Sequence, residues 1–140
     1  EIFKSFFSIV DKYLDSIEPN NEIEIITSQF KKSYNELRLV VDYIKSIDKK
    51  NYDKINGFAV EFLEMFAYVS IGYVWLKMLI TSQELNSKKN SNFLNSKIST
   101  GKFFFNNILP KTSYLKDNIT IESYNYNEYK NEYFDTGFSL

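Results

Sequence analysis

The sequence predicts an all-α protein: an up-down four-helix bundle followed by a partly irregular, tyrosine-rich C-terminal tail. Apolar residues recur at three- and four-residue steps, and the alternation typical of strands is nearly absent before the tail. Only four glycines and two prolines interrupt the 140 residues. Four amphipathic helices with short connections bury their apolar stripes most simply by packing antiparallel to one another.

The first two helices are indicated by two separate apolar stripes. The first stripe ends before Pro19 and consists of Ile2, Phe6, Ile9, Val10, Tyr13 and Ile17. A second, longer helix is expected over about 22–47, where the stripe consists of Ile23, Ile26, Phe30, Tyr34, Leu37, Val41, Ile44 and Ile47. The polar residues of 48–53 then favour a short loop.

The third helix begins in the most apolar stretch of the chain, residues 56–78, which raises the question of a membrane span. A spanning helix needs about 20 apolar residues. Here Glu61, Glu64 and Lys77 leave only residues 65–76 uncharged. We therefore expect a central helix of the bundle, packed by several neighbours, and no transmembrane span.

The fourth helix is predicted over 93–110, with a stripe that includes Leu94, Ile98 and Phe105. Glycine in a helix costs up to about 1 kcal/mol relative to alanine, so we expect a close helix contact at Gly101. Pro110 should end or bend this helix. The bundle is then residues 1–118, and residues 119–140 are a tail expected to pack on it.

The composition excludes most kinds of active site. The chain has no cysteine and no histidine, which removes thiolate zinc sites, cysteine nucleophiles and imidazole bases. A net charge of −1 does not favour nucleic-acid binding. Glu61 and Glu64 share a helix face and could be imagined as a metal or acid–base pair, but a solvated or lysine-paired face is favoured. We expect no catalytic, cofactor-binding or metal-binding residue.

A basic stretch precedes the tail. Residues 86–116 contain six lysines and no acid, a pattern that could attract the phosphates of CoA or an anionic membrane. The favoured interpretation is that the acidic tail folds back and neutralises this stretch. The acids concerned are Asp117, Glu122, Glu128, Glu132 and Asp135.

Four aromatic residues are candidates for an interface. Phe103, Phe104 and Phe105 follow one another, and neighbours on a helix are about 100° apart, so the three cannot all face one core. At least one must meet the tail or a neighbouring domain. Trp75 raises the same question, because aromatic residues often anchor contacts between proteins.

The third and fourth helices resemble a known domain. The segments "FLEMFAYVSIGYVWLKM" and "KISTGKFFFNNILP" are similar to the C-terminal helical domain of bacterial acyl-CoA dehydrogenases, including the 3-methylmercaptopropionyl-CoA dehydrogenases, over about 55–110. Gly101 stands where alanine is usual in that family. The other positions that match its motif are Lys97, Thr100, Lys102, Phe103, Phe104, Leu109 and Pro110.

The resemblance implies a C-terminal piece of a longer, cytoplasmic flavoenzyme. Such an enzyme removes the α and β hydrogens of an acyl-CoA thioester, with a carboxylate as base and FAD as hydride acceptor. In the family, FAD and the catalytic Glu belong to the preceding core, so this chain is expected to brace its own dehydrogenase core and a second subunit. The alternative is a stand-alone helical adaptor whose groove binds a partner helix.

Overall fold

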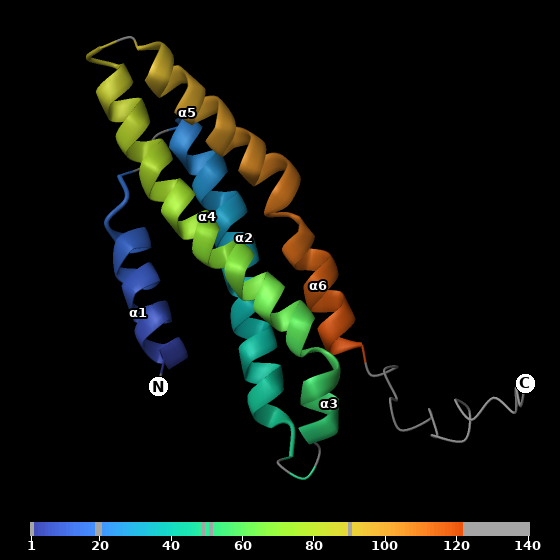
Figure 1. Cartoon of the computed structure of the whole chain (residues 1–140). Helices are drawn as coiled ribbons and strands as arrows, with labels where there is room; N and C mark the ends of the chain where they lie inside the picture. Colours follow the sequence, from blue (N-terminus) through green and yellow to red (C-terminus); the bar gives the residue numbers. More distant parts are fainter. Residues whose placement is uncertain (1, 19–20, 49, 51, 90, 122–140) are drawn as a thin grey trace, which may run out of the picture.

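The computed structural model of the chain describes residues 2–18, 21–48, 50, 52–89 and 91–121, and all regular structure in these ranges is helical (Figure 1). The predicted all-α class is confirmed. The elements are α1 Ile2–Asp15, α2 Asn21–Ser46, α3 Tyr52–Gly57, α4 Ala59–Asn86, α5 Asn92–Phe103, the π-helical turn η2 Phe104–Ile108, and α6 Lys111–Thr120.

These elements form four helical columns, with α5, η2 and α6 stacked end to end as the fourth (Figure 1). The helix α4 is the central element, because α2, α5, η2 and α6 all pack against it. α2 also contacts α6, and the short α1 lies along the opposite side of α4. The fourth predicted helix corresponds to α5 and η2, and past Pro110 the column continues as α6.

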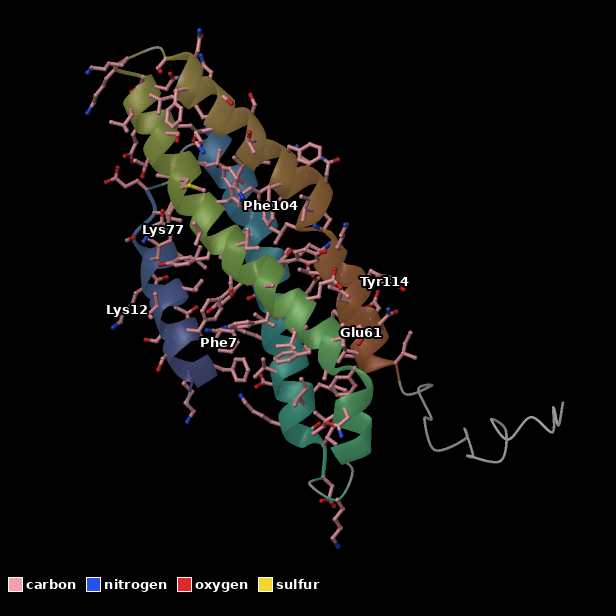
Figure 2. The ribbon with its side chains drawn as sticks, viewed as in Figure 1. Phe7, Lys12, Glu61, Lys77, Phe104 and Tyr114 are labelled. Carbon is pink, nitrogen blue, oxygen red and sulfur yellow. The ribbon has the colours of Figure 1, made fainter. Side chains whose placement is uncertain are left out.

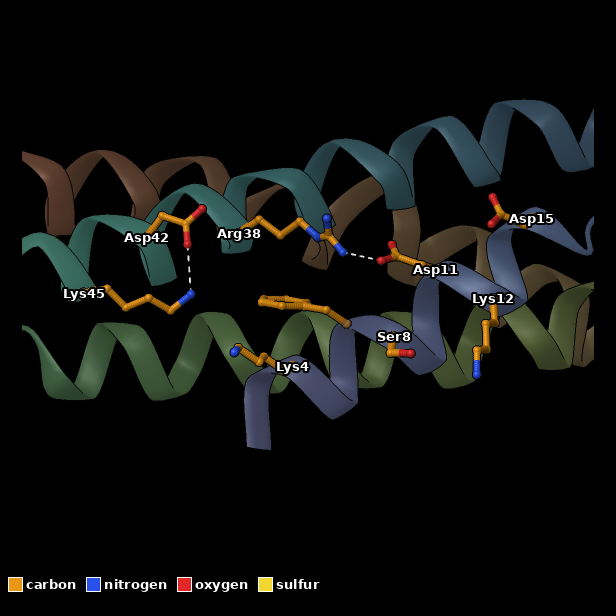
Figure 3. A pocket seen from close by; sticks show the side chains of 9 residues that line it. Lys4, Ser8, Asp11, Lys12, Asp15, Arg38, Asp42 and Lys45 are labelled. Atoms are coloured by element: carbon orange, nitrogen blue, oxygen red, sulfur yellow. Dashed lines mark hydrogen bonds and ion pairs between the residues drawn. The ribbon is translucent and has the colours of Figure 1, made fainter. Parts of the chain in front are cut away.

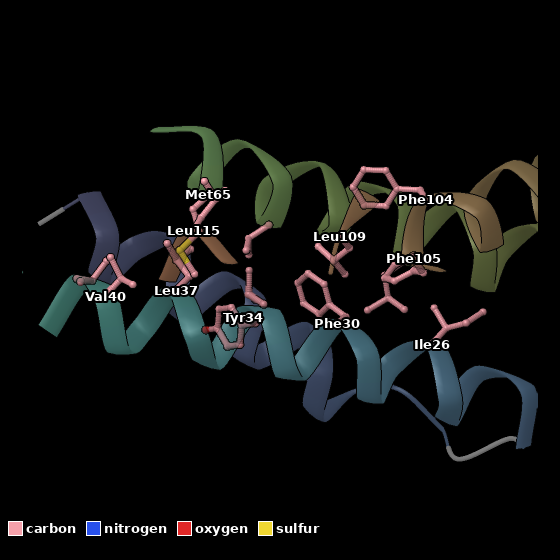
Figure 4. Packing of buried hydrophobic residues seen from close by; sticks show 14 of the residues in the cluster. Ile26, Phe30, Tyr34, Leu37, Val40, Met65, Phe104, Phe105, Leu109 and Leu115 are labelled. Atoms are coloured by element: carbon pink, nitrogen blue, oxygen red, sulfur yellow. The ribbon is translucent and has the colours of Figure 1, made fainter. Parts of the chain in front are cut away.

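The core lies between α2, α4 and the fourth column (Figure 4). Phe30 and Tyr34 of α2 stack with their ring centroids 5.8 Å apart. Burying a side chain such as leucine or phenylalanine stabilises a fold by about 1.5–3 kcal/mol. The largest fully buried side chains are Phe30, Phe105, Leu37, Met65, Leu76, Leu79, Leu109 and Ile119.

The helix α1 is attached mainly through aromatic rings. The ring of Phe6 lies 5.1 Å from that of Phe66, and the ring of Tyr13 lies 5.5 Å from that of Tyr73, centroid to centroid. Val10, one turn from Tyr13, is fully buried. Edge-to-face and tilted ring pairs contribute about 0.5–1.5 kcal/mol beyond the area that they bury. These rings hold α1 on α4.

The close helix contact predicted at Gly101 is confirmed. A Cβ atom added to Gly101 would lie 2.6 Å from Cγ of Leu79, closer than real Cβ contacts come. Gly72 is another close point, where a Cβ atom would lie 3.2 Å from Cδ1 of Leu109. These glycines let the fourth column approach α4 closely.

The turn η2 decides which of the three successive phenylalanines enter the core. The backbone N–H of Leu109 donates to the carbonyl of Phe104 at 2.9 Å, the i to i+5 bond of a π-helix. A π turn holds more residues than an α turn, so successive side chains are rotated by less than 100°. Phe104 and Phe105 both reach the core as a result, and Phe103 is 59% exposed.

A buried polar network ties α6 to α2. Oγ1 of the fully buried Thr112 lies 2.8 Å from Oγ of Ser33 and 3.0 Å from Oε2 of Glu36. The hydroxyl of Ser113 donates to the other carboxylate oxygen of Glu36 at 2.7 Å. Pro110 directly precedes α6, so the chain bends there and brings Thr112 over α2.

By length and composition alone, α4 is apolar enough to cross a membrane. An 18-residue window of it has a mean hydropathy of 1.4, and 28% of that window is buried inside the chain. However, α2 lies along α4 and exposes Lys31, Lys32 and Lys45, which hydrocarbon would have to desolvate. The expectation that α4 does not span a membrane therefore stays a prediction.

The packing role expected of the tail concerns residues outside the described ranges, apart from 119–121. Helix α6 continues to Thr120, and Ile119 is buried. Of the acids expected to neutralise the basic stretch, Asp117 is described: its carboxylate lies 2.9 Å from the ammonium of Lys116, and the hydrogen bond raises the pKa of Lys116.

We expect Gly101→Leu to lower the free energy of unfolding by about 1–3 kcal/mol, because the new side chain overpacks the contact with Leu79. The control is Ser99→Leu, at an exposed position of the same helix. Thermal melts of both variants and the wild type test this. An unchanged or raised midpoint for Gly101→Leu would mean that α5 does not pack closely on α4.

We expect Thr112→Val to lower the free energy of unfolding by about 1–3 kcal/mol, because the hydroxyl of Ser33 and the carboxylate of Glu36 lose a buried partner. Thr100→Val is the matched control, since Thr100 is exposed and its hydroxyl donates to the Ser96 carbonyl of its own helix. Urea unfolding curves measure the difference. Equal effects of the two substitutions would contradict a role for this network in holding α6.

Candidate interface on the central helix

The helix α4 carries an exposed, nearly uninterrupted apolar surface, which we call the α4 stripe. Val60 is 74% exposed, Leu63 65% and Val74 51%. The stripe residues follow one another at steps of three and four, so they share one face of the helix. They are Val60, Leu63, Ala67, Ile71, Val74, Met78, Thr81 and Leu85.

The α4 stripe exists because α4 is apolar on two faces. The opposite face carries Met65, Val69, Leu76 and Leu79, which are all buried in the core. A helix that is apolar all round is normally buried all round. In this chain the neighbours of α4 cover only part of its circumference, and the stripe contains no charged side chain.

Both flanks of the α4 stripe are covered by contacts within the chain (Figure 2). On the side of α1, the ammonium of Lys77 lies 5.4 Å from the ring centroids of both Tyr13 and Tyr73. On the side of α5, the indole of Trp75 stacks on Phe104, with the ring centroids 6.5 Å apart. The stripe is thus an uncharged strip between two aromatic borders.

The structure separates the four aromatic residues proposed as interface candidates. Trp75 and Phe104 contact each other, Phe104 is 6% exposed, and Phe105 is fully buried in the core. Only Phe103 presents most of its side chain to the surroundings. The sequence reasoning expected surplus apolar surface on this helix but missed the α4 stripe. The sequence signal for the α4 stripe is a second set of apolar residues at helical spacing in the same segment.

The positions that match the family motif make local contacts. Lys97 places its ammonium 5.5 Å from the ring centroid of Phe93, and the hydroxyl of Thr100 donates to the carbonyl of Ser96 at 2.9 Å. Lys102 and Pro110 are exposed. With Gly101 at its contact with Leu79, these positions shape and place α5 and do not converge on one site.

The carboxylates of Glu61 and Glu64 do not assemble a metal site in the described part of the chain, where no group of three or more acidic side chains comes together. Glu64 accepts a hydrogen bond from the hydroxyl of Tyr68, which raises the pKa of that phenol. Lys111 lies 5.9 Å from the Tyr68 ring centroid. This contact between a cation and an aromatic ring joins α6 to this side of α4.

A hollow of about 420 Å³ lies between α1 and α2 (Figure 3). Its centre is Arg38, which forms an ion pair with Asp11 and lies 4.9 Å from the ring centroids of both Phe7 and Tyr34. The remaining charged groups around it are of both signs, and they are Lys4, Lys12, Asp15, Asp42 and Lys45. The hollow therefore offers no surface of a single sign to a ligand.

The hydroxyl of Tyr34 is enclosed by this cluster. It accepts from the guanidinium of Arg38 at 2.9 Å and lies 2.8 Å from a carboxylate oxygen of Asp11 and 3.0 Å from the carbonyl oxygen of Phe7. Burial, followed by the hydrogen bond to Asp11, raises the pKa of Tyr34 to about 12. The phenol of Tyr34 is therefore neutral when the cluster joins α1 to α2.

FAD does not fit the hollows that this part of the chain offers. Its diphosphate needs backbone N–H groups at a helix N-terminus or unpaired cations. In the hollow beside α2 the guanidinium of Arg38 is paired with Asp11, and the lysines there lie among the carboxylates of Asp15 and Asp42, which would repel a diphosphate. A second hollow, of about 690 Å³ between α1 and α4, is lined by the carboxylates of Glu18 and Glu84. A phosphate there would meet like charge.

We expect the free energy of unfolding to fall more steeply between pH 9 and pH 11 in the wild type than in Tyr34→Phe. The unfolded phenol ionises near pH 10, whereas the folded one keeps its proton to about pH 12, so stability present below pH 10 is lost as the pH rises. Urea unfolding at both pH values measures this, with the exposed Tyr114→Phe as control. Equal slopes for all three proteins would contradict the raised pKa.

Comparison with known proteins gives a single assignment. The model of the family described as "Acetyl-CoA dehydrogenase C-terminal like" matches residues 6–127. No curated protein and no solved structure matches the chain significantly. The matched range extends well beyond the stretch 55–110 on which the resemblance was based, and it includes all six α-helices in whole or in part. The chain therefore belongs to the acyl-CoA dehydrogenase C-terminal-like family.

Proposed function

We propose that this chain is the accessory C-terminal domain of an FAD-dependent acyl-CoA dehydrogenase, with a packing or oligomerisation role and no catalytic residue of its own. Membership of the family supports the parent enzyme. The observation that carries the packing role is the α4 stripe, which exposes apolar side chains along the central helix. In the parent, the α,β-dehydrogenation of the acyl-CoA thioester belongs to the preceding core.

The free energy of apolar burial favours a covered stripe. Each Å² of apolar surface removed from water is worth about 25 cal/mol, and contiguous exposed apolar patches usually mark contact sites. Phe103, on the neighbouring column, is a further exposed aromatic residue. The partners that we propose are the dehydrogenase core of the same protein and a second subunit.

Two finer assignments belong to this proposal. The motif around Lys97, Thr100, Gly101, Lys102 and Pro110 supports a parent from the 3-methylmercaptopropionyl-CoA dehydrogenase-like group. We also propose a cytoplasmic location, which agrees with the intracellular CoA thioesters that such enzymes use. Membership of the family supports both assignments, and the motif is the observation that favours this subgroup.

A stand-alone helical adaptor is the second candidate. The α4 stripe favours it to the extent that an uncharged helical face can receive an amphipathic helix from another protein. The two candidates differ in what the gene encodes upstream of Glu1. An accessory domain needs a dehydrogenase core there, and an adaptor does not.

The test uses the full-length product of the gene that contains this sequence, beside the 140-residue chain alone. We expect the full-length protein to carry FAD and to oxidise an acyl-CoA in the presence of an electron acceptor. Fluorescence titration should show no tight FAD binding to the chain alone, because its hollows place carboxylates where the diphosphate would lie. A flavin-free full-length protein, or stoichiometric binding by the chain, would contradict the proposal.

A further inference from the structure

We propose that the α4 stripe is the contact surface for a second copy of this chain. The two copies of α4 lie antiparallel, each with its stripe against that of the other. This inference rests on the proposed packing role and deepens it, because it names the partner and the register. The argument uses the spacing of the stripe, its lack of charge and its length.

Six of the eight α4 stripe residues form pairs that are symmetric about a point between Gly72 and Tyr73, whereas Leu63 and Thr81 do not. Ile71 and Val74 lie at equal distances on either side of this point, as do Ala67 and Met78, and Val60 and Leu85. A two-fold axis through this point, perpendicular to the helix, exchanges the members of each pair. Every apolar side chain of these pairs then meets an apolar side chain of the second copy.

The spacing of the stripe suits another helix. Apolar residues at steps of three and four are the pattern by which two helices interlock their side chains. A second copy supplies the same pattern over the same length. The stripe contains no charged residue, so it cannot select a partner of opposite charge. Partner choice then depends on the shape and spacing of its apolar side chains.

The charges beside the stripe tolerate this arrangement. Glu64 lies on the flank toward α5 and α6, and Lys77 lies on the flank toward α1. The perpendicular two-fold axis places like flanks together, in opposite directions along the helix. Under this axis Glu64 lies level with Thr81 of the second copy, so it meets no carboxylate there.

The stripe is long enough for a small interface. From Val60 to Leu85 a helix extends about 38 Å, and a third of the surface of a cylinder about 10 Å wide over that length is about 400 Å². Two copies would bury about 800 Å² in total, the size of a weak, transient contact. The structure therefore predicts reversible, concentration-dependent pairing.

Other occupants fit the stripe less well. A lipid phase around α4 would also enclose the exposed lysines of α2, which lies along it. The tail of the same chain, 122–140, carries four acidic residues, whereas the stripe offers them no cation. These occupants are outcomes of the tests below.

The first test is analytical ultracentrifugation of the 140-residue chain over a range of concentrations, with two matched variants. Leu63→Glu places a carboxylate in the stripe, where Leu63 is 65% exposed. Leu39→Glu makes the same change at a position of α2 that is 62% exposed and lies outside the stripe. We expect Leu63→Glu to raise the dimer dissociation constant about tenfold or more, and Leu39→Glu to leave it nearly unchanged.

The second test fixes the register by disulfide formation, which the absence of native cysteine makes simple. The double variant Val60→Cys/Leu85→Cys should form covalent dimers under mild oxidation, because the two positions meet across the axis. Val60→Cys alone should not, since two such residues would lie about 38 Å apart. Efficient dimers from Val60→Cys alone would overturn the antiparallel register in favour of a parallel one.

A wild-type chain that stays monomeric at all concentrations and gives no disulfide-linked dimer from the double variant overturns the pairing. If that chain also floats with phosphatidylcholine–phosphatidylglycerol vesicles, and Leu63→Glu does not, lipid is the occupant. If deletion of 122–140 restores pairing, the occupant is the tail. Each of these results would contradict the pairing without changing the expected flavin content of the full-length protein. A full-length protein without flavin, beside a chain that dimerises, would contradict the proposed function and leave the pairing intact.

Discussion

The packing of every other column against one central helix is the constraint on which the fold depends. The inner face of α4 provides Met65, Val69, Leu76 and Leu79 to the core, and α2 and the fourth column are held through it. Because this face is apolar throughout, it favours burial against other helices but does not set how closely they approach α4. Distance is specified at Gly72 and Gly101, where the absence of a side chain lets Leu109 and Leu79 approach.

Two polar clusters give this apolar fold its specific geometry. The carboxylate of Glu36 and the hydroxyls of α6 lock the lower half of the fourth column to α2, and the ion pair of Arg38 with Asp11 orients α1. A half-exposed ion pair adds only about 0.2–1 kcal/mol, whereas an orphaned buried group costs about 1–3 kcal/mol. The buried cluster therefore contributes more to the position of its helix.

The outer face of the same central helix is the surface on which the proposed packing role depends. The described hollows combine charges of both signs or expose carboxylates, and the acidic residues do not converge. The outer face of α4, in contrast, presents an uncharged strip along the full length of the helix. A bundle that leaves one apolar face of its central helix exposed has the form expected of a module that packs against a neighbour.

The sequence by itself determined the helical class, the bounds of α2 to within a residue or so, the bend at Pro110 and the close contact at Gly101, because these depend on periodicity and backbone chemistry within one segment. It also carried the family resemblance. Only the tertiary structure decided which face of α4 stays open and which phenylalanines enter the core. Both depend on neighbours distant in sequence and on the π turn, which shifts the helical phase where regular spacing predicts none.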